Sequence, residues 1–347
     1  MELDDNHFNK KSREAEWDVF KGILMICVVI GHLDFGDNVR QYIYAFHMPL
    51  FFLISGFFYH PSTKNLRDGG VKNRAKSLLE PYIFMVMINY IFWIVLYRAE
   101  NIFSPIIHIF WANTVDGIPI AGALWFLTSL FFVYLIVSIL DRIDSDKWKI
   151  FVIISFAIIG SLLKFLPFRL PLGLDCAIEG TVFFEMGYFL QSGKILSCFL
   201  NLGNKKIAVL SSIALGISLP LIFLNGTVNF RDLEFAILPL TYVNALLSLI
   251  VYLGLSKIIS TSCNKWGKVV QYELQFIGRN TLVFLGFHQL ARWFVVRAVN
   301  KVIFIDFCGV EIIRRICYVV GCIVLCQLLT HFFNNIKSIR RVLHILV

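Results

Sequence analysis

The chain has 347 residues, of which 58% are apolar and 16% are charged. A soluble domain carries about a quarter charged residues and about 45–50% apolar ones, so this composition excludes an ordinary soluble enzyme, a disordered chain and a fibrous repeat. The net charge of +9 is typical of basic residues that flank membrane spans, and we therefore expect no nucleic-acid partner. The composition indicates a multi-pass membrane protein.

Apolar runs bounded by charged residues, Pro, Gly or Asn predict about ten membrane-spanning helices. These runs are too long and too uniformly apolar to be the strands of a membrane barrel. We therefore expect an all-α transmembrane bundle in one domain, residues 17–333, with tails at 1–16 and 334–347. The predicted spans are 17–35, 39–60, 77–98, 121–140, 148–166, 171–192, 205–224, 234–257, 279–298 and 311–333.

The orientation of the bundle follows from its loops, because basic residues near span ends are retained on the cytoplasmic side. Alternate loops and the two tails place nineteen Lys and Arg residues on one side of the membrane and five on the other. We therefore expect both termini in the cytoplasm and the protein in the cytoplasmic (inner) membrane.

The first span carries three ionisable side chains, and such residues are functional candidates because they are costly inside a membrane unless paired or hydrated. Asp18, Lys21 and His32 are these residues. At about 100° per residue, Lys21 and His32 lie within about 20° of the same helix face and about 16 Å apart along the axis. The spacing predicts the wall of a cavity that is reached from the cytoplasm, with His32 deep in the far half of the bilayer.

Histidine is well suited to take a proton from a hydroxyl near neutral pH, because its unperturbed pKa lies there. We predict His32 as a general base, with Lys21 and Asp18 assisting it; an imidazole bonded to a neighbouring helix is the alternative. The eight histidines show neither HxxxH nor HExxH spacing, so we expect no metal site and no bound cofactor.

The second span contains His47 directly before Met48-Pro49, and then Ser55-Gly56. Proline bends a helix, while Ser-Gly permits close contact between helices or exposure of the backbone. We expect His47 and Ser55 to line the cavity; for His47, packing and support of catalysis both fit the pattern.

A basic group follows the second span. Lys72, Arg74 and Lys76 stand just before Pro81-Tyr82, at the predicted cytoplasmic face. Their side chains suit phosphate groups of a ligand, and the alternative is a purely topological role as positive-inside residues.

Three later residues complete the predicted cavity. Trp125 opens the fourth span, where an aromatic residue is either an interfacial anchor or a ligand contact. Asn280 lies at a helix start after Arg279, and His288 follows inside that span. We expect His288 to be structural or to line the cavity rather than to act as the base.

These residues belong to a set of short motifs that occur in a fixed order along the chain. The motifs are Asp18-x-x-Lys21-Gly22, Gly31-His32, Phe46-His47-Met48-Pro49-Leu50-Phe51-Phe52, Ser55-Gly56, Pro81-Tyr82, Leu124-Trp125-Phe126-Leu127, Phe183-Phe184 with Gly187, and Ile277-Gly278-Arg279-Asn280 with His288. By their order and spacing, the chain resembles the acyltransferase-3 family of integral membrane acyltransferases, in its fucose 4-O-acetylase-like O-acetyltransferase branch. The resemblance extends over nearly the whole chain.

The resemblance implies a ten-helix bundle that passes an acyl group, usually acetyl from acetyl-CoA on the cytoplasmic side, to a glycan hydroxyl. The implied acceptor is a capsular or other cell-surface polysaccharide, the O-antigen of lipopolysaccharide, or a lipid-linked sugar. His32 is then the essential base. Lys21 stands where many relatives have Arg and assists the donor, whereas Lys72, Arg74 and Lys76 depart from the family's common Arg-x-x-Arg arrangement. Implied partners are membrane lipid and proteins of envelope glycan assembly.

The rival hypothesis is a transporter or flippase of sugars or lipids, because polar residues on span faces suit transport as well. Transport by alternating access usually requires paired halves with broken helices in matching positions, and no such pairing is evident in this sequence. A one-sided charged stripe that ends in a histidine favours chemistry. A small-molecule acyltransferase is a more remote alternative.

Overall fold

A computed structural model describes residues 2–61, 70–97, 102–110, 118–303 and 308–345. These residues are almost entirely helical, which confirms the predicted all-α class. Their strands form one short antiparallel hairpin that pairs Val228 with Phe235. The elements are α1 Glu2–Gly31, α2 Asp37–Tyr44, α3 His47–Phe57, α4 Gly70–Tyr97, α5 Ser104–Phe110, η1 Pro119–Leu124, α7 Trp125–Leu140, α8 Asp146–Leu162, η2 Leu163–Phe165, η3 Pro171–Gly173, α9 Leu174–Ser192, α10 Ile195–Leu200, α11 Asn204–Asn225, β1 Val228–Asn229, β2 Glu234–Phe235, α12 Leu238–Ser260, α13 Lys265–Arg279, α14 Thr281–Val302, α15 Cys308–Asn334 and α16 Lys337–Val342.

Within the described residues, seven helical segments are long and apolar enough to cross a membrane. They are α4, η1 with α7, α8 with η2, α11, α12, α14 and α15. The other three predicted spans fall on α1, on α2 with α3, and on α9. The bundle is therefore polytopic, whereas the count of ten spans and the cytoplasmic position of both termini stay predictions.

The second predicted span, 39–60, is two helices rather than one. α2 ends at Tyr44 and α3 begins at His47, with Phe46 at a non-helical φ of −138° between them. Pro49 explains the break, because proline lacks the N–H that would continue a helix yet fits its first turn.

Two other predicted boundaries are wrong. The eighth span does not begin at 234, since residues 234–235 form β2 and α12 begins only at Leu238, with Pro239 in its first turn. The first helix begins at Glu2 rather than at residue 17.

Helix α13 was not predicted from the sequence. α13 carries charged residues throughout and is therefore too polar to read as a span, yet it buries Leu274, Phe276, Ile277 and Gly278. This buried face packs along α1. α13 and α14 are separated by the single residue Asn280, and both contact α1.

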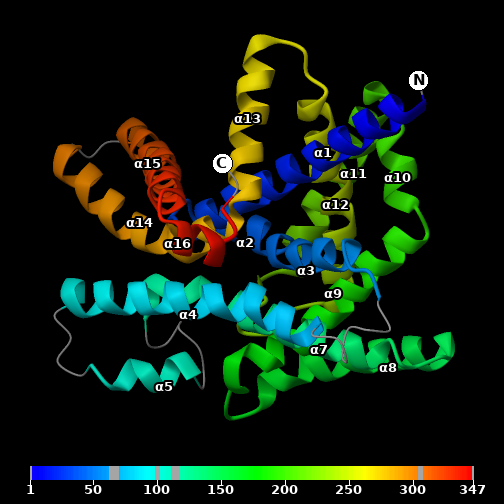
Figure 1. Cartoon of the computed structure of the whole chain (residues 1–347), viewed down its shortest axis with the longest axis horizontal. Helices are drawn as coiled ribbons and strands as arrows, with labels where there is room; N and C mark the ends of the chain where they lie inside the picture. The colour runs from blue at the N-terminus through cyan, green and yellow to red at the C-terminus, as the bar shows by residue number, and fades with distance from the viewer. Residues whose placement is uncertain (1, 62–69, 98–101, 111–117, 304–307, 346–347) are drawn as a thin grey trace.

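Helix α1 lies in the middle of the bundle. It contacts α12, α13, α14 and α15, and Figure 1 shows it running between the α14–α15 pair and the α11–α12 pair, with α4 and α7 below. α3 packs against α9 on the other side of the core. The centre is filled by large side chains with almost no exposed surface, including Phe20, Phe52, Phe184 and Phe284.

The outer surface of the bundle is apolar. In α8 the buried residue is Gly160, while six large apolar side chains of the same helix are more than half exposed. An apolar surface of this kind is stable against lipid tails rather than water. The exposed residues are Trp148, Ile150, Phe151, Ile154, Ile158 and Leu162.

Glycines set the distance between α1 and α13. A Cβ on Gly278 would overlap the backbone carbonyl of Asp18, and a Cβ on Gly22 would overlap that of Leu274. Small residues let helix backbones approach this closely in membranes. We expect Gly278→Ala to lower the free energy of unfolding by about 1–3 kcal/mol, the usual cost of overpacking.

The measurement is the thermal melting temperature of the purified protein in detergent. Gly216→Ala is the matched control, because no atom lies within 4 Å of a Cβ built there. Equal melting temperatures for the two variants would contradict the close packing of α1 on α13.

Candidate functional site

His32 lies directly after the last residue of α1, half-buried among side chains from two other elements. Its ring centre is 5.1 Å from that of His288 in α14 and 6.5 Å from that of Tyr44 in α2. Tyr44 in turn lies 5.1 Å from the ring of His47. The structure thus groups three of the predicted residues, His32, His47 and His288, around the end of α1.

Gln289 fixes the hydrogen bonding of His32. The Ala123 backbone N–H donates to Gln289 Oε1 at 3.3 Å, so the amide group presents its NH₂ to the other side. There Gln289 Nε2 lies 3.4 Å from His32 Nδ1. Because an amide nitrogen only donates, Nδ1 is the ring nitrogen that carries a lone pair, and it faces Gln289.

His47 and His288 are each bound to their own helix. His47 Nδ1 donates to the Ile43 carbonyl at 2.8 Å, and His288 Nδ1 donates to the Phe284 carbonyl at 2.8 Å. These bonds place the proton of the neutral ring on Nδ1 and the lone pair on Nε2. His288 Nε2 is buried and has no hydrogen-bond partner among the described residues.

A cavity of about 210 Å³ lies beside this histidine group. Gln289 belongs both to its wall and to the contact with His32. The same helix contributes Arg292, Trp293 and Arg297, and Tyr97 and Pro119 close the opposite wall. The sequence analysis did not assign Gln289, Trp293 or Arg297; they follow His288 in the run HQLARWFVVR, where the polar residues at helical spacing were the available signal.

Asp18 and Lys21 lie in the middle of α1, about three helical turns before His32, in a three-residue ionic cluster. Asp18 Oδ1 is 2.8 Å from Lys21 Nζ, and Asp18 Oδ2 is 2.9 Å from Arg279 Nε at the end of α13. Asp18 therefore contacts α13, and His32 contacts α14, which follows α13 directly. Asp18 and His32 thus both face the segment formed by α13 and α14. The ionic cluster of Asp18, Lys21 and Arg279 carries one net positive charge.

A series of contacts connects this ionic cluster to Arg74. Trp17, next to Asp18, packs on Phe57 and Phe58 at the end of α3, with ring centres 4.5 and 5.3 Å away. The next residue, Tyr59, lines a small cavity together with Arg74, whose guanidinium lies 4.2 Å from the Tyr134 ring centre.

The other two members of the predicted basic group, Lys72 and Lys76, are exposed in the first turns of α4. Arg74 is thus the member whose side chain is held by a defined contact.

Three predicted cavity residues lie elsewhere in the core. Ser55 Oγ donates to the Phe51 carbonyl at 2.8 Å, and Asn280 Nδ2 donates to the Phe276 carbonyl at 2.8 Å. Trp125 is buried and stacks on Phe230, with ring centres 6.2 Å apart. The two polar side chains bond to helix carbonyls and the tryptophan packs on another ring, which sequence spacing does not reveal. The cavity beside Gln289 is lined by other residues.

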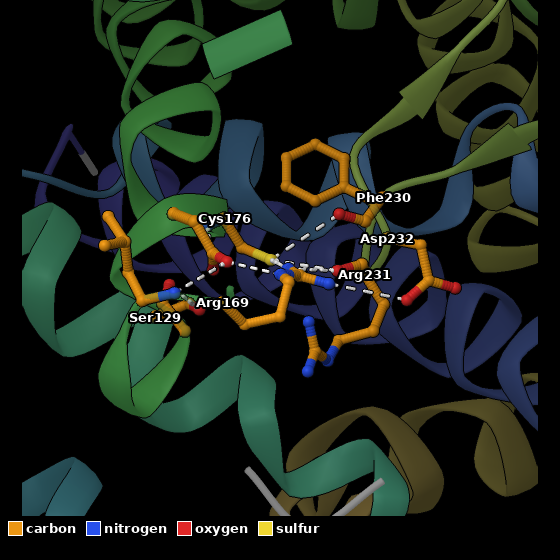
Figure 2. A network of polar contacts seen from close by, with 9 residues as sticks. Ser129, Arg169, Cys176, Phe230, Arg231 and Asp232 are labelled. Atoms are coloured by element: carbon orange, nitrogen blue, oxygen red, sulfur yellow. Dashed lines mark hydrogen bonds and ion pairs between the residues drawn. The ribbon is translucent and has the colours of Figure 1, made fainter. Parts of the chain in front are cut away.

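A second polar network joins the segment before α9 to the hairpin. Arg169 Nε donates to Asp175 Oδ2 at 2.5 Å, and Arg169 Nη2 donates to the Arg231 carbonyl at 2.6 Å. Figure 2 shows the Arg169 guanidinium between Cys176 of α9 and the Arg231–Asp232 segment. Burial opposes the charge of Arg169, but the hydrogen bond and charge of Asp175 outweigh it and raise the pKa of the guanidinium above its usual range.

No group of three or more His, Cys, Asp or Glu side chains in the part of the chain that the structure describes could hold a metal ion. The histidine group presents imidazole and amide groups, and the cavity beside it is lined by guanidinium groups. Fold and site together define a membrane-embedded protein with a half-buried histidine between an ionic cluster and a cavity.

Comparison with known proteins assigns the family. The Acyl_transf_3 model, an acyltransferase domain, matches residues 14–331, so the chain belongs to this family. It is also similar to Nodulation protein NolL of Mesorhizobium japonicum, with 28% identity over 162 residues. That match covers 42% of this chain and 40% of the relative. No solved structure matches the chain.

The network around Arg169 makes a prediction about stability. Asp175 is almost fully buried, so Arg169→Gln leaves a buried carboxylate without its cation. We expect a loss of about 3–5 kcal/mol in the free energy of unfolding. The measurement is chemical or thermal unfolding in detergent.

Arg40→Gln is the matched control for this measurement, because the Arg40–Asp37 pair is largely exposed and such pairs contribute at most about 1 kcal/mol. Similar losses for both substitutions would show that the network does not secure the hairpin.

Proposed function

We propose that the protein is an O-acetyltransferase that moves acetyl from acetyl-CoA to a hydroxyl of an envelope glycan, with His32 as the general base. The proposed acceptors are a cell-surface or capsular polysaccharide, the O-antigen of lipopolysaccharide, or a lipid-linked sugar. The observation that carries the proposal is the position of His32 Nδ1, which faces Gln289 at the wall of the cavity.

The proposed reaction uses this lone pair. An acceptor hydroxyl in the cavity takes the place of the Gln289 amide at His32 Nδ1, whose 3.4 Å contact is long for a hydrogen bond and easily replaced. Nδ1 takes the proton as the hydroxyl oxygen bonds to the acetyl carbonyl carbon. The carbon–sulfur bond then breaks, and His32 returns the proton to the CoA sulfur. The products are the acetyl ester and free CoA.

His288 suits a supporting role in this reaction. Its ring lies beside that of His32, and its Nε2 carries a lone pair without a partner among the described residues. When His32 becomes an imidazolium, this lone pair is available to the second ring N–H of His32. The bundle interior also limits water, which would otherwise hydrolyse the thioester.

The donor is proposed to enter at the end of the bundle that holds Lys21 and Arg74. Phosphate groups bind favourably to lysine and arginine side chains, and Lys72 and Lys76 are exposed on the turns of α4 beside Arg74. Lys21 lies one turn after Asp18 on α1, and His32 directly follows the last residue of that helix. An acetyl-CoA bound there would extend its acetyl arm along α1 toward His32.

The cellular setting is part of the proposal. The loop charges favour the cytoplasmic (inner) membrane, with the donor end in the cytoplasm and the cavity on the opposite side. Proteins of envelope glycan assembly would then supply the acceptor from that side.

The central prediction concerns His32→Ala. We expect transfer of labelled acetyl from acetyl-CoA into cell-envelope glycan to fall about 10²–10⁴-fold, the usual contribution of a general base. The assay compares membranes that contain equal amounts of each variant.

His60→Ala is the matched control for this assay, because His60 is an exposed histidine at the end of the α3 segment. Near-normal transfer by a folded His32→Ala protein would disprove the role of His32 as base.

A separate prediction concerns the donor end. We expect Lys21→Ala and Arg74→Ala to raise the KM for acetyl-CoA about tenfold or more, because each removes a charged hydrogen-bond donor worth about 1.5–3 kcal/mol. Lys21→Arg should keep the KM near that of the original protein, since the positive charge is retained.

The exposed Lys205→Ala serves as control, and initial rates at varied acetyl-CoA concentration give the KM. An unchanged KM in both alanine variants would place the donor elsewhere.

A further inference from the structure

The cavity beside His32 has a positively charged wall. Its volume of about 210 Å³ gives room for one sugar ring of an acceptor. Arg292 and Arg297 line it, and the lining contains no acidic residue among those described.

These two arginines differ from others in the bundle. Arg169 and Arg279 each bind a carboxylate of the chain itself. No ion pair found among the described residues includes Arg292 or Arg297. A guanidinium presents a planar set of donors that matches carboxylate and phosphate groups. Arg292 and Arg297 are exposed at the cavity, so their guanidinium groups can pair with an anionic ligand there.

Trp293 holds one of these arginines in place and adds a donor for hydroxyl groups. The Arg297 guanidinium lies 3.6 Å from the Trp293 ring centre, and its Nη1 donates to the Trp293 carbonyl at 3.3 Å. This stacking limits the freedom of a long side chain at the cavity. The indole Nε1 of Trp293 is buried without a hydrogen-bond partner among the described residues, so it is available to a hydroxyl.

The arginines stand at a short distance from the base. Gln289, which contacts His32, precedes Arg292 by three residues and Arg297 by eight, or about 4.5 and 12 Å along the helix axis. One ligand can therefore place an anionic group at the arginines and a hydroxyl at His32 Nδ1.

We propose that this cavity recognises the acceptor through a negative charge, so that the acetylated sugar itself carries a carboxylate or a phosphate beside the reacting hydroxyl. The inference rests on the acyltransferase reaction proposed above and adds the chemical class of its acceptor. The group transfer is unchanged: acetyl passes from sulfur to the sugar oxygen, and the hydroxyl proton passes through His32 to the CoA sulfur.

The test is direct binding, measured by isothermal titration calorimetry on the full-length protein in detergent without acetyl-CoA. The probes are methyl glucuronide, glucose 6-phosphate, methyl glucoside and inorganic phosphate. We expect at least one anionic sugar to bind about tenfold or more tightly than methyl glucoside, and more tightly than inorganic phosphate. Tighter binding of methyl glucuronide would indicate a carboxylate on the natural acceptor, and tighter binding of glucose 6-phosphate would indicate a phosphate.

Substitutions then locate the charge that is recognised. Arg292→Gln and Arg297→Gln should each weaken binding of the anionic sugar about tenfold or more and leave the glucoside unaffected. Arg292→Lys should recover part of the loss, because it restores the charge without the planar donor set. Lys301→Gln is the control, an exposed basic residue of the same helix outside the cavity wall.

Two results would overturn the proposal. If both anionic sugars bind no more tightly than methyl glucoside, the cavity does not recognise the negative charge. If inorganic phosphate and glucose 6-phosphate bind equally, the cavity does not recognise the sugar. The ligand comparison needs only the original protein, so it holds even if an arginine variant fails to fold. His32→Ala should bind the anionic sugar normally. If the original protein binds the anionic sugar but transfers no acetyl to it from acetyl-CoA, the result counts against the proposed reaction and not against this site.

Discussion

The hydrogen-bonded link from Ala123 through Gln289 to His32 organises the candidate site. The backbone N–H of Ala123 orients the Gln289 amide, and that orientation leaves the lone pair of His32 on Nδ1, toward the cavity wall. Without the link, the imidazole at the end of α1 would have no fixed tautomer, and the cavity would have no chemical connection to it. The proposed base, its direction and the proposed acceptor site all depend on this one bridging side chain.

The rest of the fold places the link within a continuous helical frame. Close glycine contacts set α13 against α1, and Asn280 then leads directly into α14, which carries both Gln289 and the arginines of the cavity. In an apolar bundle a buried polar group is costly without a partner, so most of them are bonded to helix carbonyls or to opposite charges. His288 Nε2 departs from this pattern among the described residues, and it lies beside the base, where an unused lone pair is useful.

The sequence was sufficient for the class of fold, whereas the roles of the site residues stay predictions. Apolar run length predicts helices in lipid reliably, and the eleven-residue step from Lys21 to His32 predicts that both lie on one side of the first span because helix periodicity is fixed. It was insufficient where tertiary contacts decide. Ser55 and Asn280 are polar like cavity residues, yet their side chains bond to their own helix backbone. Gln289 and Arg297 share a helical spacing with Arg292, but that spacing alone does not say which helix they face, and the packing of α14 brings Gln289 to His32 and both residues to the cavity.

The central claim is that His32 promotes acetyl transfer from a donor bound at one end of the bundle to an acceptor bound at the other. The most direct measurement uses the protein in sealed liposomes in one orientation, with labelled acetyl-CoA on one side of the membrane and a methyl glucuronide acceptor on the other. The account predicts acetylated sugar when acetyl-CoA is on the side of Lys21 and Arg74 and the sugar is on the side of Arg292 and Arg297. Product that forms only when both substrates share one side would contradict it.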